Sequence, residues 1–141
     1  MIKKYTIAVL LSLIIPAVLF SSSGKKLRFK NSQEAELGGK LGSGAMIIDA
    51  YYENCHSKGV RTDNQLRGID KLMKKKWGIS WSKAKFVLEE RSGRDFREES
   101  HTMIHHMIKK YKGCNTRGMK KWFNTVSKMH GKNLDKFHAL K

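Results

Sequence analysis

Proline, cysteine and acidic residues are scarce in this chain of 141 residues, and each scarcity excludes something. The only proline is Pro16, so no proline interrupts a helix anywhere after it. The only cysteines are Cys55 and Cys114. Neither comes directly after the N-terminal apolar run, so a lipoprotein-type attachment has no acceptor. Twelve Asp and Glu stand against 29 Lys and Arg, a formal net charge of +17. An excess of this size produces a strongly positive potential, which favours anionic partners.

Recognisable catalytic patterns are also missing. Cys55 and His56 are adjacent, so on a helix their side chains diverge instead of meeting. The glycines between residues 38 and 44 follow no predicted strand, so they do not form a phosphate loop. The sequence therefore predicts a protein that is not an enzyme.

The N-terminal segment has the pattern of a secretory signal peptide. Lys3 and Lys4 precede an apolar run over residues 7–20, and small residues follow at 21–24. The run covers only about 21 Å as a helix, short of the roughly 30 Å hydrocarbon core of a bilayer. We predict a signal peptide over 1–23, a basic linker over 24–33 and a helical domain over 34–141. The protein is then secreted or periplasmic; the alternative is a short membrane anchor at 1–23.

The two cysteines predict one disulfide, because an even count in an exported chain is typical of crosslinked domains. Pairing Cys55 with Cys114 closes a loop of about 60 residues, which stabilises the fold by roughly 4 kcal/mol in the chain-entropy model. The rest of the chain shows helical periodicity and no convincing strand alternation. The fold class is all-α, a small bundle of about five short helices.

The helix boundaries are predicted from capping residues and glycines. A capping box opens the first helix near Asn31, with Glu34 three residues on, and a second capping box runs from Thr62 to Gln65. We expect the glycines at 38–44 to break the first helix, since each weakens a helix by about 1 kcal/mol relative to Ala. The expected segments are 31–59 with that break, 62–77, 80–93, 94–111, 115–131, and a short C-terminal turn holding Leu134, Phe137 and Leu140.

A histidine stripe is the segment most suggestive of chemistry. Glu98, His101 and His105 are spaced i, i+3 and i+7, so they share one side of a helix. Two imidazoles at i and i+4 with a carboxylate one turn earlier match the ligands of a divalent transition metal. A fourth ligand would have to come from His130, His138 or Met107. We favour a structural role for the stripe and keep a metal-binding envelope protein as the alternative.

Residues 71–85 offer another alternative, because the chain around them resembles a helix-turn-helix motif over about 20 residues. Gly78-Ile79-Ser80 matches its turn, and the apolar residues from Met73 to Val87 fall at its buried positions. Lys74 departs from the motif where a small residue is expected. The resemblance implies DNA binding by the second helix, which would present Trp81, Ser82, Lys83 and Lys85 outward.

The leading prediction is a cationic binding surface. Basic residues are concentrated on both sides of the acidic cluster at 89–99. We expect the surface to consist mainly of Lys74, Lys75, Lys83, Lys85, Lys109, Lys110, Lys120 and Lys121. Its partner would be an anionic macromolecule or membrane surface: an acidic protein, anionic lipid or envelope polymer, or nucleic acid. No cofactor is predicted apart from the metal of the alternative hypothesis.

Overall fold

The computed structural model describes residues 30–57 and 60–141, and the predicted signal segment lies outside them. Within these residues there are five α-helices and no strand, which confirms the all-α prediction. The helices are α2 (Ser32–Cys55), α3 (Asn64–Trp77), α4 (Trp81–Ser92), α5 (Phe96–Tyr111) and α6 (Arg117–Ala139). The predicted disulfide between Cys55 and Cys114 is confirmed, with the two Cα atoms 5.5 Å apart. Helix α2 begins two residues before the predicted domain boundary at residue 34.

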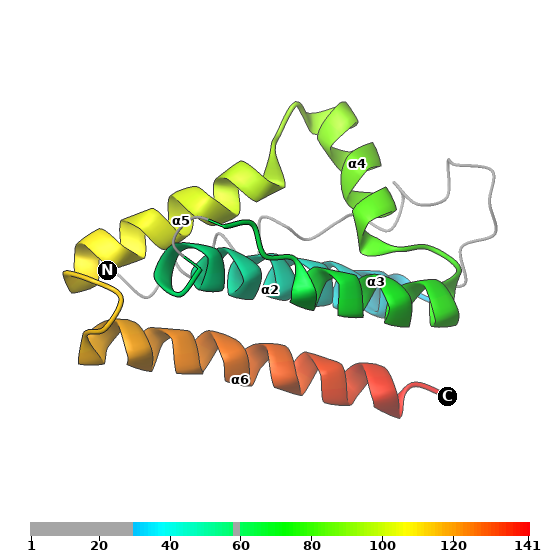
Figure 1. Cartoon of the computed structure of the whole chain (residues 1–141). Helices are drawn as coiled ribbons and strands as arrows, with labels where there is room; N and C mark the ends of the chain where they lie inside the picture. The colour runs from blue at the N-terminus through cyan, green and yellow to red at the C-terminus, as the bar shows by residue number, and fades with distance from the viewer. Residues whose placement is uncertain (1–29, 58–59) are drawn as a thin grey trace.

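Helix α2 is the central element of the bundle. It lies between α5 and α6 with α3 alongside, while α4 rises away from the other helices (Figure 1). Most of its residues are buried, including the carboxylate-bearing residues Glu34, Asp49 and Glu53. A helix surrounded in this way needs polar partners as well as apolar ones, because a buried polar group is costly unless it is hydrogen-bonded.

The predicted break at the glycines of α2 is wrong, since the helix runs unbroken from Ser32 to Cys55. The small residues form a contact face instead. The indole of Trp81 lies directly on Gly42, where an added Cβ would be 2.0 Å from the ring. The imidazole of His130 lies on Gly44, where a Cβ would be 2.5 Å from Nδ1. Close packing of α4 and α6 therefore outweighs the low helix propensity of glycine.

Side chains cap the helix N-termini, partly as predicted. Asn31 Oδ1 accepts a hydrogen bond from Glu34 N at 3.0 Å, and the Glu34 carboxylate accepts one from Lys30 N rather than from Asn31 N. The predicted Thr62–Gln65 capping box is wrong, because Thr62 Oγ1 donates to the carbonyl of Asp49. Asp49 itself caps α3 from the side of α2. Ser80 caps α4 as expected.

Helix α6 also differs from the prediction, because it begins after the N-cap Thr116 rather than at Asn115 and does not end at Gly131. It continues to Ala139, so the predicted C-terminal turn is part of the same helix. The apolar stripe explains this continuity. Its buried residues are spaced by three, four or seven, which suits one face of a long helix: Met119, Trp122, Val126, His130 and Phe137.

Two apolar clusters make up the core. One joins the N-terminal half of α2 to α3 and α4, with Trp77 and Trp81 at 1% and 0% exposure. The other joins the C-terminal half of α2 to α5 and α6 around Ile104 and Met119, next to the disulfide. A stacked pair of rings, Tyr51 and Phe123, belongs to this second cluster. The two clusters hold the helices that carry the polar groups described next.

Candidate functional site

The histidine stripe faces α2. Asn54 contacts both imidazoles: its Nδ2 lies 3.0 Å from His101 Nδ1, and its Oδ1 lies 2.7 Å from His105 Nε2. Asn54 Nδ2 also donates to the carbonyl of Ala50. This arrangement requires that His101 Nδ1 accepts and that His105 Nε2 donates. One amide side chain therefore links the two histidines of α5 to the C-terminal part of α2.

Glu53 is the carboxylate beside this network, in place of the predicted Glu98. Both of its oxygens accept from Arg97 Nη2, at 3.0 and 2.9 Å, and His101 Nε2 lies 3.5 Å from Glu53 Oε2. Burial lowers the pKa of the His101 imidazole, although the Glu53 carboxylate opposes this shift. A neutral His101 agrees with a Nδ1 atom that accepts a hydrogen bond from Asn54.

The predicted metal-ligand set does not come together with further ligands. Nothing in residues 30–57 and 60–141 forms a group of three or more His, Cys, Asp or Glu side chains able to hold a metal ion. The His101 and His105 ring centroids are 6.4 Å apart, and each ring contacts Asn54. His130, considered as a fourth ligand, is buried against α2. The metal-binding alternative therefore gains no support from this geometry.

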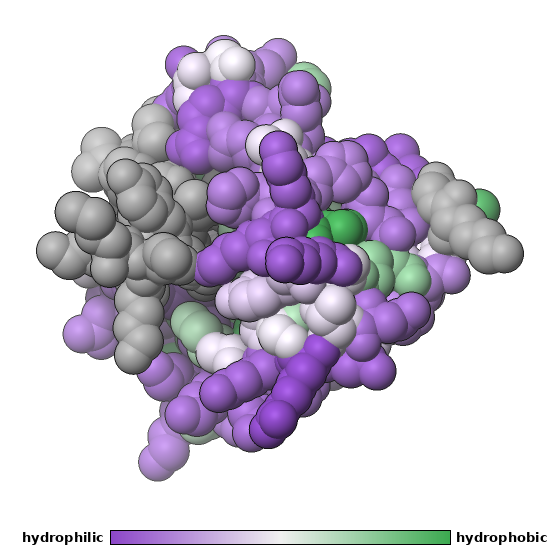
Figure 2. Space-filling model, turned by 90° about the vertical axis from the view of Figure 1, so that its left-hand side faces the viewer, coloured by the Kyte–Doolittle hydropathy of each residue, from purple (hydrophilic) through white to green (hydrophobic). Residues whose placement is uncertain are grey.

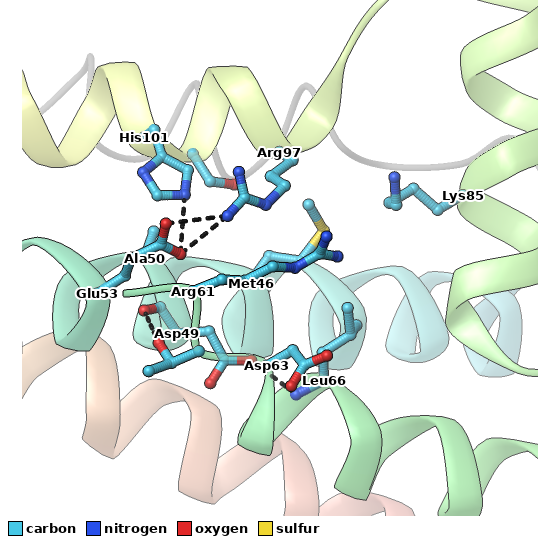
Figure 3. A pocket seen from close by; sticks show the side chains of 12 residues that line it. Met46, Asp49, Ala50, Glu53, Arg61, Asp63, Leu66, Lys85, Arg97 and His101 are labelled. Atoms are coloured by element: carbon cyan, nitrogen blue, oxygen red, sulfur yellow. Dashed lines mark hydrogen bonds and ion pairs between the residues drawn. The ribbon is translucent and has the colours of Figure 1, made fainter. Parts of the chain in front are cut away.

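A small hollow lies next to the Glu53 network, between α2, α4, α5 and the segment before α3 (Figure 3). It encloses about 60 Å³, room for a few water molecules or one small chemical group. Charged side chains of both signs line it. They are Asp49, Glu53, Arg61, Asp63, Lys85 and Arg97, with His101 at the α5 side.

Among the residues that line the hollow, Asp49 stabilises the start of α3. Its two carboxylate oxygens accept from the backbone N–H groups of Gln65 and Leu66 at 3.0 and 2.9 Å. Burial raises the pKa of Asp49, while the two backbone hydrogen bonds oppose that rise. Asp49 thus satisfies orphan N–H groups in the first turn of α3, a role usually filled by an N-cap residue of the same helix.

The eight lysines of the predicted surface do not form one continuous face. Lys74 and Lys75 of α3 lie with Lys83 and Lys85 of α4 near one end of the bundle (Figure 1). Lys85 is occupied there by an ion pair with Glu89 at 2.8 Å. The other four lysines lie near the turn between α5 and α6, at the opposite end (Figure 1). The structure thus divides the predicted surface into two groups.

The second group lies in a stretch of sequence without acidic residues. We call it the α5–α6 end, defined as Lys109, Lys110, Lys112, Arg117, Lys120 and Lys121. Among the described residues, none of the six takes part in an ion pair, and five are exposed. Figure 2 views the molecule from this side, and hydrophilic residues surround a smaller pale and green area. No Asp or Glu occurs between residues 100 and 134.

The pair of helices resembling a helix-turn-helix uses its second helix for packing. Trp81, expected to point outward, is fully buried on Gly42, and its Nε1 lies 3.2 Å from Met46 Sδ. Ser82 N donates to Asp70 Oδ1 at 2.9 Å, and Ser82 Oγ donates to the same carboxylate. Two of the residues expected to contact DNA, Trp81 and Ser82, therefore make packing contacts and hydrogen bonds within the protein instead.

Several polar residues that matter in the structure were not predicted. Glu53 and Asn54 look like ordinary solvated residues in the sequence, and only the packing of α5 on α2 reveals their partners. His130 did carry a signal, because it lies four residues after Val126 and seven before Phe137, on the apolar stripe of α6. It is 5% exposed, and neither of its ring nitrogens has a hydrogen-bond partner among the described residues. Burial lowers its pKa.

Comparisons with known protein families, curated proteins and solved structures found no match to this chain. Of the helices in the described part, none combines the length and the apolar character needed to cross a bilayer. The chemistry of the site thus rests on two features: the α5–α6 end and the charged hollow beside Glu53.

Proposed function

We propose that the protein binds an anionic macromolecule or membrane surface through the α5–α6 end, and that it does so without catalysing a reaction. The observation that carries this proposal is the charge of residues 100–134, which include eight Lys and Arg and no acidic residue. Six of the eight belong to the turn between α5 and α6 or to the helix ends beside it. The other two, Lys128 and Lys132, are exposed further along α6.

Unpaired surface cations suit a polyanionic partner for a physical reason. Cations that already share an ion pair gain less from a new anion, whereas those of the α5–α6 end pair with no acidic side chain in residues 30–57 and 60–141. Binding to a polyanion also releases counterions, which makes the affinity steeply dependent on salt. The partner classes with this chemistry are an acidic protein, anionic lipid or envelope polymer, and nucleic acid. The disulfide supports a secreted or periplasmic location, where such bonds persist.

The test compares two triple variants with the same change in charge. Lys109→Gln, Lys120→Gln, Lys121→Gln removes three cations from the α5–α6 end, and Lys71→Gln, Lys74→Gln, Lys75→Gln removes three exposed cations from α3. Heparin chromatography gives the salt concentration at which each protein elutes. We expect the α5–α6 variant to elute at clearly lower salt than the α3 variant. Equal decreases, or retention that persists at about 1 M salt, where the Debye length is about 3 Å, would contradict the proposal.

A second measurement separates the partner classes. Each protein is mixed with vesicles containing anionic lipid, with an acidic peptide, and with single- and double-stranded nucleic acid, at one fixed ionic strength. The class whose binding depends most on Lys109, Lys120 and Lys121 identifies the partner. Because all classes are compared at the same ionic strength, differences in affinity among them do not come from different screening of the charges by salt.

A further inference from the structure

We infer that the hollow beside Glu53 binds one carboxylate group, held by Arg61 and by N–H groups of Arg97 that have no partner. This site is separate from the α5–α6 end, and the inference does not depend on the proposed function. Arg61 comes from the segment before α3 and Arg97 from α5. Together with Lys85 of α4, they line the same hollow (Figure 3).

The acidic groups that line the hollow already have partners. Glu53 is bound by Arg97, Asp49 accepts two backbone N–H groups of α3, and Asp63 pairs with Arg67 at 3.2 Å. Glu53 and Asp63 are thus paired with a cation, whereas both oxygens of Asp49 are occupied by backbone N–H groups. The unused donors of the basic groups therefore determine which ligand the hollow can bind.

The basic groups, in contrast, have unused donors. Arg97 reaches Glu53 only through Nη2, which leaves Nε and Nη1 without a partner among the described residues. Arg61 is exposed and takes part in no ion pair or hydrogen bond within that part of the chain. A guanidinium carries five N–H donors in a planar fork. Arg61 therefore offers five N–H groups, and Nε and Nη1 of Arg97 offer three more, eight in total, of which a single anion would engage only some.

The position of the charges around the hollow favours an anion beside Arg61. Three cationic and three anionic side chains line the hollow, so its total charge does not select a ligand. Lys85 is paired with Glu89, and Arg97 is paired with Glu53. Among the described residues, Arg61 is the cation of the lining that takes part in no ion pair. An anion placed between Arg61 and Arg97 would pair with the charge of Arg61 and form charge-assisted hydrogen bonds with both guanidinium groups.

Size and charge select a carboxylate among the oxyanions. The hollow of about 60 Å³ has room for one compact group and not for an extended chain. A carboxylate matches the planar fork of arginine and carries a single negative charge. A phosphate carries nearly two charges at neutral pH and would be repelled more strongly by Asp49, Glu53 and Asp63. The carboxylate can belong to a small organic acid or to an acidic side chain of a peptide.

The experiment follows the Arg Nε–Hε signals of the ¹⁵N-labelled full chain by NMR during titration with sodium acetate, against sodium chloride at equal ionic strength. We expect saturable shifts of the Arg61 and Arg97 signals. In Arg61→Gln the affinity for acetate falls about 10-fold or more, as expected for lost hydrogen bonds to a charged group. Arg61→Lys keeps the charge without the fork and gives an intermediate affinity. Arg61 is exposed and makes no ion pair or hydrogen bond with the described residues, so the melting temperature of Arg61→Gln should match that of wild type.

Lys71→Gln is the matched control, because it removes one exposed cation away from the hollow and should leave acetate binding unchanged. The triple variant of the α5–α6 end should also keep it, which separates this inference from the proposed function. A glutamate-rich peptide in place of acetate tells the two sources apart: tighter, Arg61-dependent binding of the peptide identifies an acidic side chain as the ligand. Shifts that do not saturate, equal affinity in Arg61→Gln, or tighter binding of inorganic phosphate would overturn the inference.

Discussion

Gly42 is the position where a single added methyl group should damage the fold most clearly. A Cβ at this position would lie 2.0, 2.4 and 2.5 Å from three carbon atoms of the Trp81 indole. Carbon atoms pack best at about 3.5–4.0 Å, so the ring would have to move by about 1.5 Å. Trp81 is fully buried between α2 and α4, and its Nε1 contact with Met46 Sδ would be lost.

The expected size of the effect follows from two opposing contributions. Overpacking of a rigid, buried ring costs about 3 kcal/mol, the upper part of the usual range. Alanine regains about 1 kcal/mol of helix propensity relative to glycine. We therefore expect Gly42→Ala to lower the free energy of unfolding by about 2 kcal/mol and the melting temperature by roughly 10 °C in a domain of this size.

The same substitution at an open position provides the control. Gly131 lies inside α6 with nothing within 4 Å of an added Cβ, and Gly68 of α3 is equally open. Gly131→Ala and Gly68→Ala should each raise stability by about 0.5–1 kcal/mol through helix propensity alone. Urea unfolding of the three variants measures these differences. If Gly42→Ala were as stable as wild type or more so, α4 would not be held against α2 by this contact.

Two further predictions concern titration and the crosslink. Burial lowers the pKa of His130 below its ordinary value of 6.5, so the folded protein binds fewer protons than the unfolded chain and loses stability as the pH falls below about 6.5. His130→Leu should weaken this loss between pH 7.5 and 5.5 in urea unfolding, whereas His101, whose pKa burial also lowers, keeps its contribution; an unchanged pH dependence in His130→Leu would contradict the reasoning. Reduction of Cys55–Cys114 should lower the free energy of unfolding by about 4 kcal/mol, and a loss under about 1 kcal/mol in denaturant titrations with and without reductant would show that the loop is already constrained in the unfolded state.

Local sequence patterns were sufficient to predict the fold class and most helix ends. Apolar periodicity and capping residues such as Ser80 act within one turn, so they are visible without any tertiary information. The glycines of α2 and Gly131 of α6 misled the prediction because their helix propensity was considered alone. Burial on all sides stabilises α2, and a continuous apolar stripe stabilises α6. Both helices therefore continue through their glycines despite the low helix propensity of that residue.

The two candidate sites also differ in how far the sequence alone could predict them. Lys109, Lys110, Lys120 and Lys121 of the α5–α6 end could be named from the sequence because surface charge needs no partner to be recognised, whereas Lys112 and Arg117 were not named. The hollow could not, since it depends on residues far apart in the chain: Glu53, Arg61 and Arg97 meet only through the packing of α5 and the segment before α3 on α2. Helical spacing predicted that His101 and His105 share one side of a helix, but it gave no indication that Asn54 would contact both imidazoles.

The two faces of α2 explain why a charged hollow exists in so small a core. On one side, Gly42 lets Trp81 approach until the indole touches the helix backbone, which brings the start of α4 close. On the other side, polar contacts of Glu53 and Asn54 hold α5 against α2. Long side chains such as Arg97 keep the two helices further apart there than apolar side chains would. The space remaining between α4 and α5 is therefore lined by charged groups. The ion pair at the wall of this space leaves the Arg97 side chain 42% exposed, so it adds at most about 1 kcal/mol to stability and does not by itself account for the hollow.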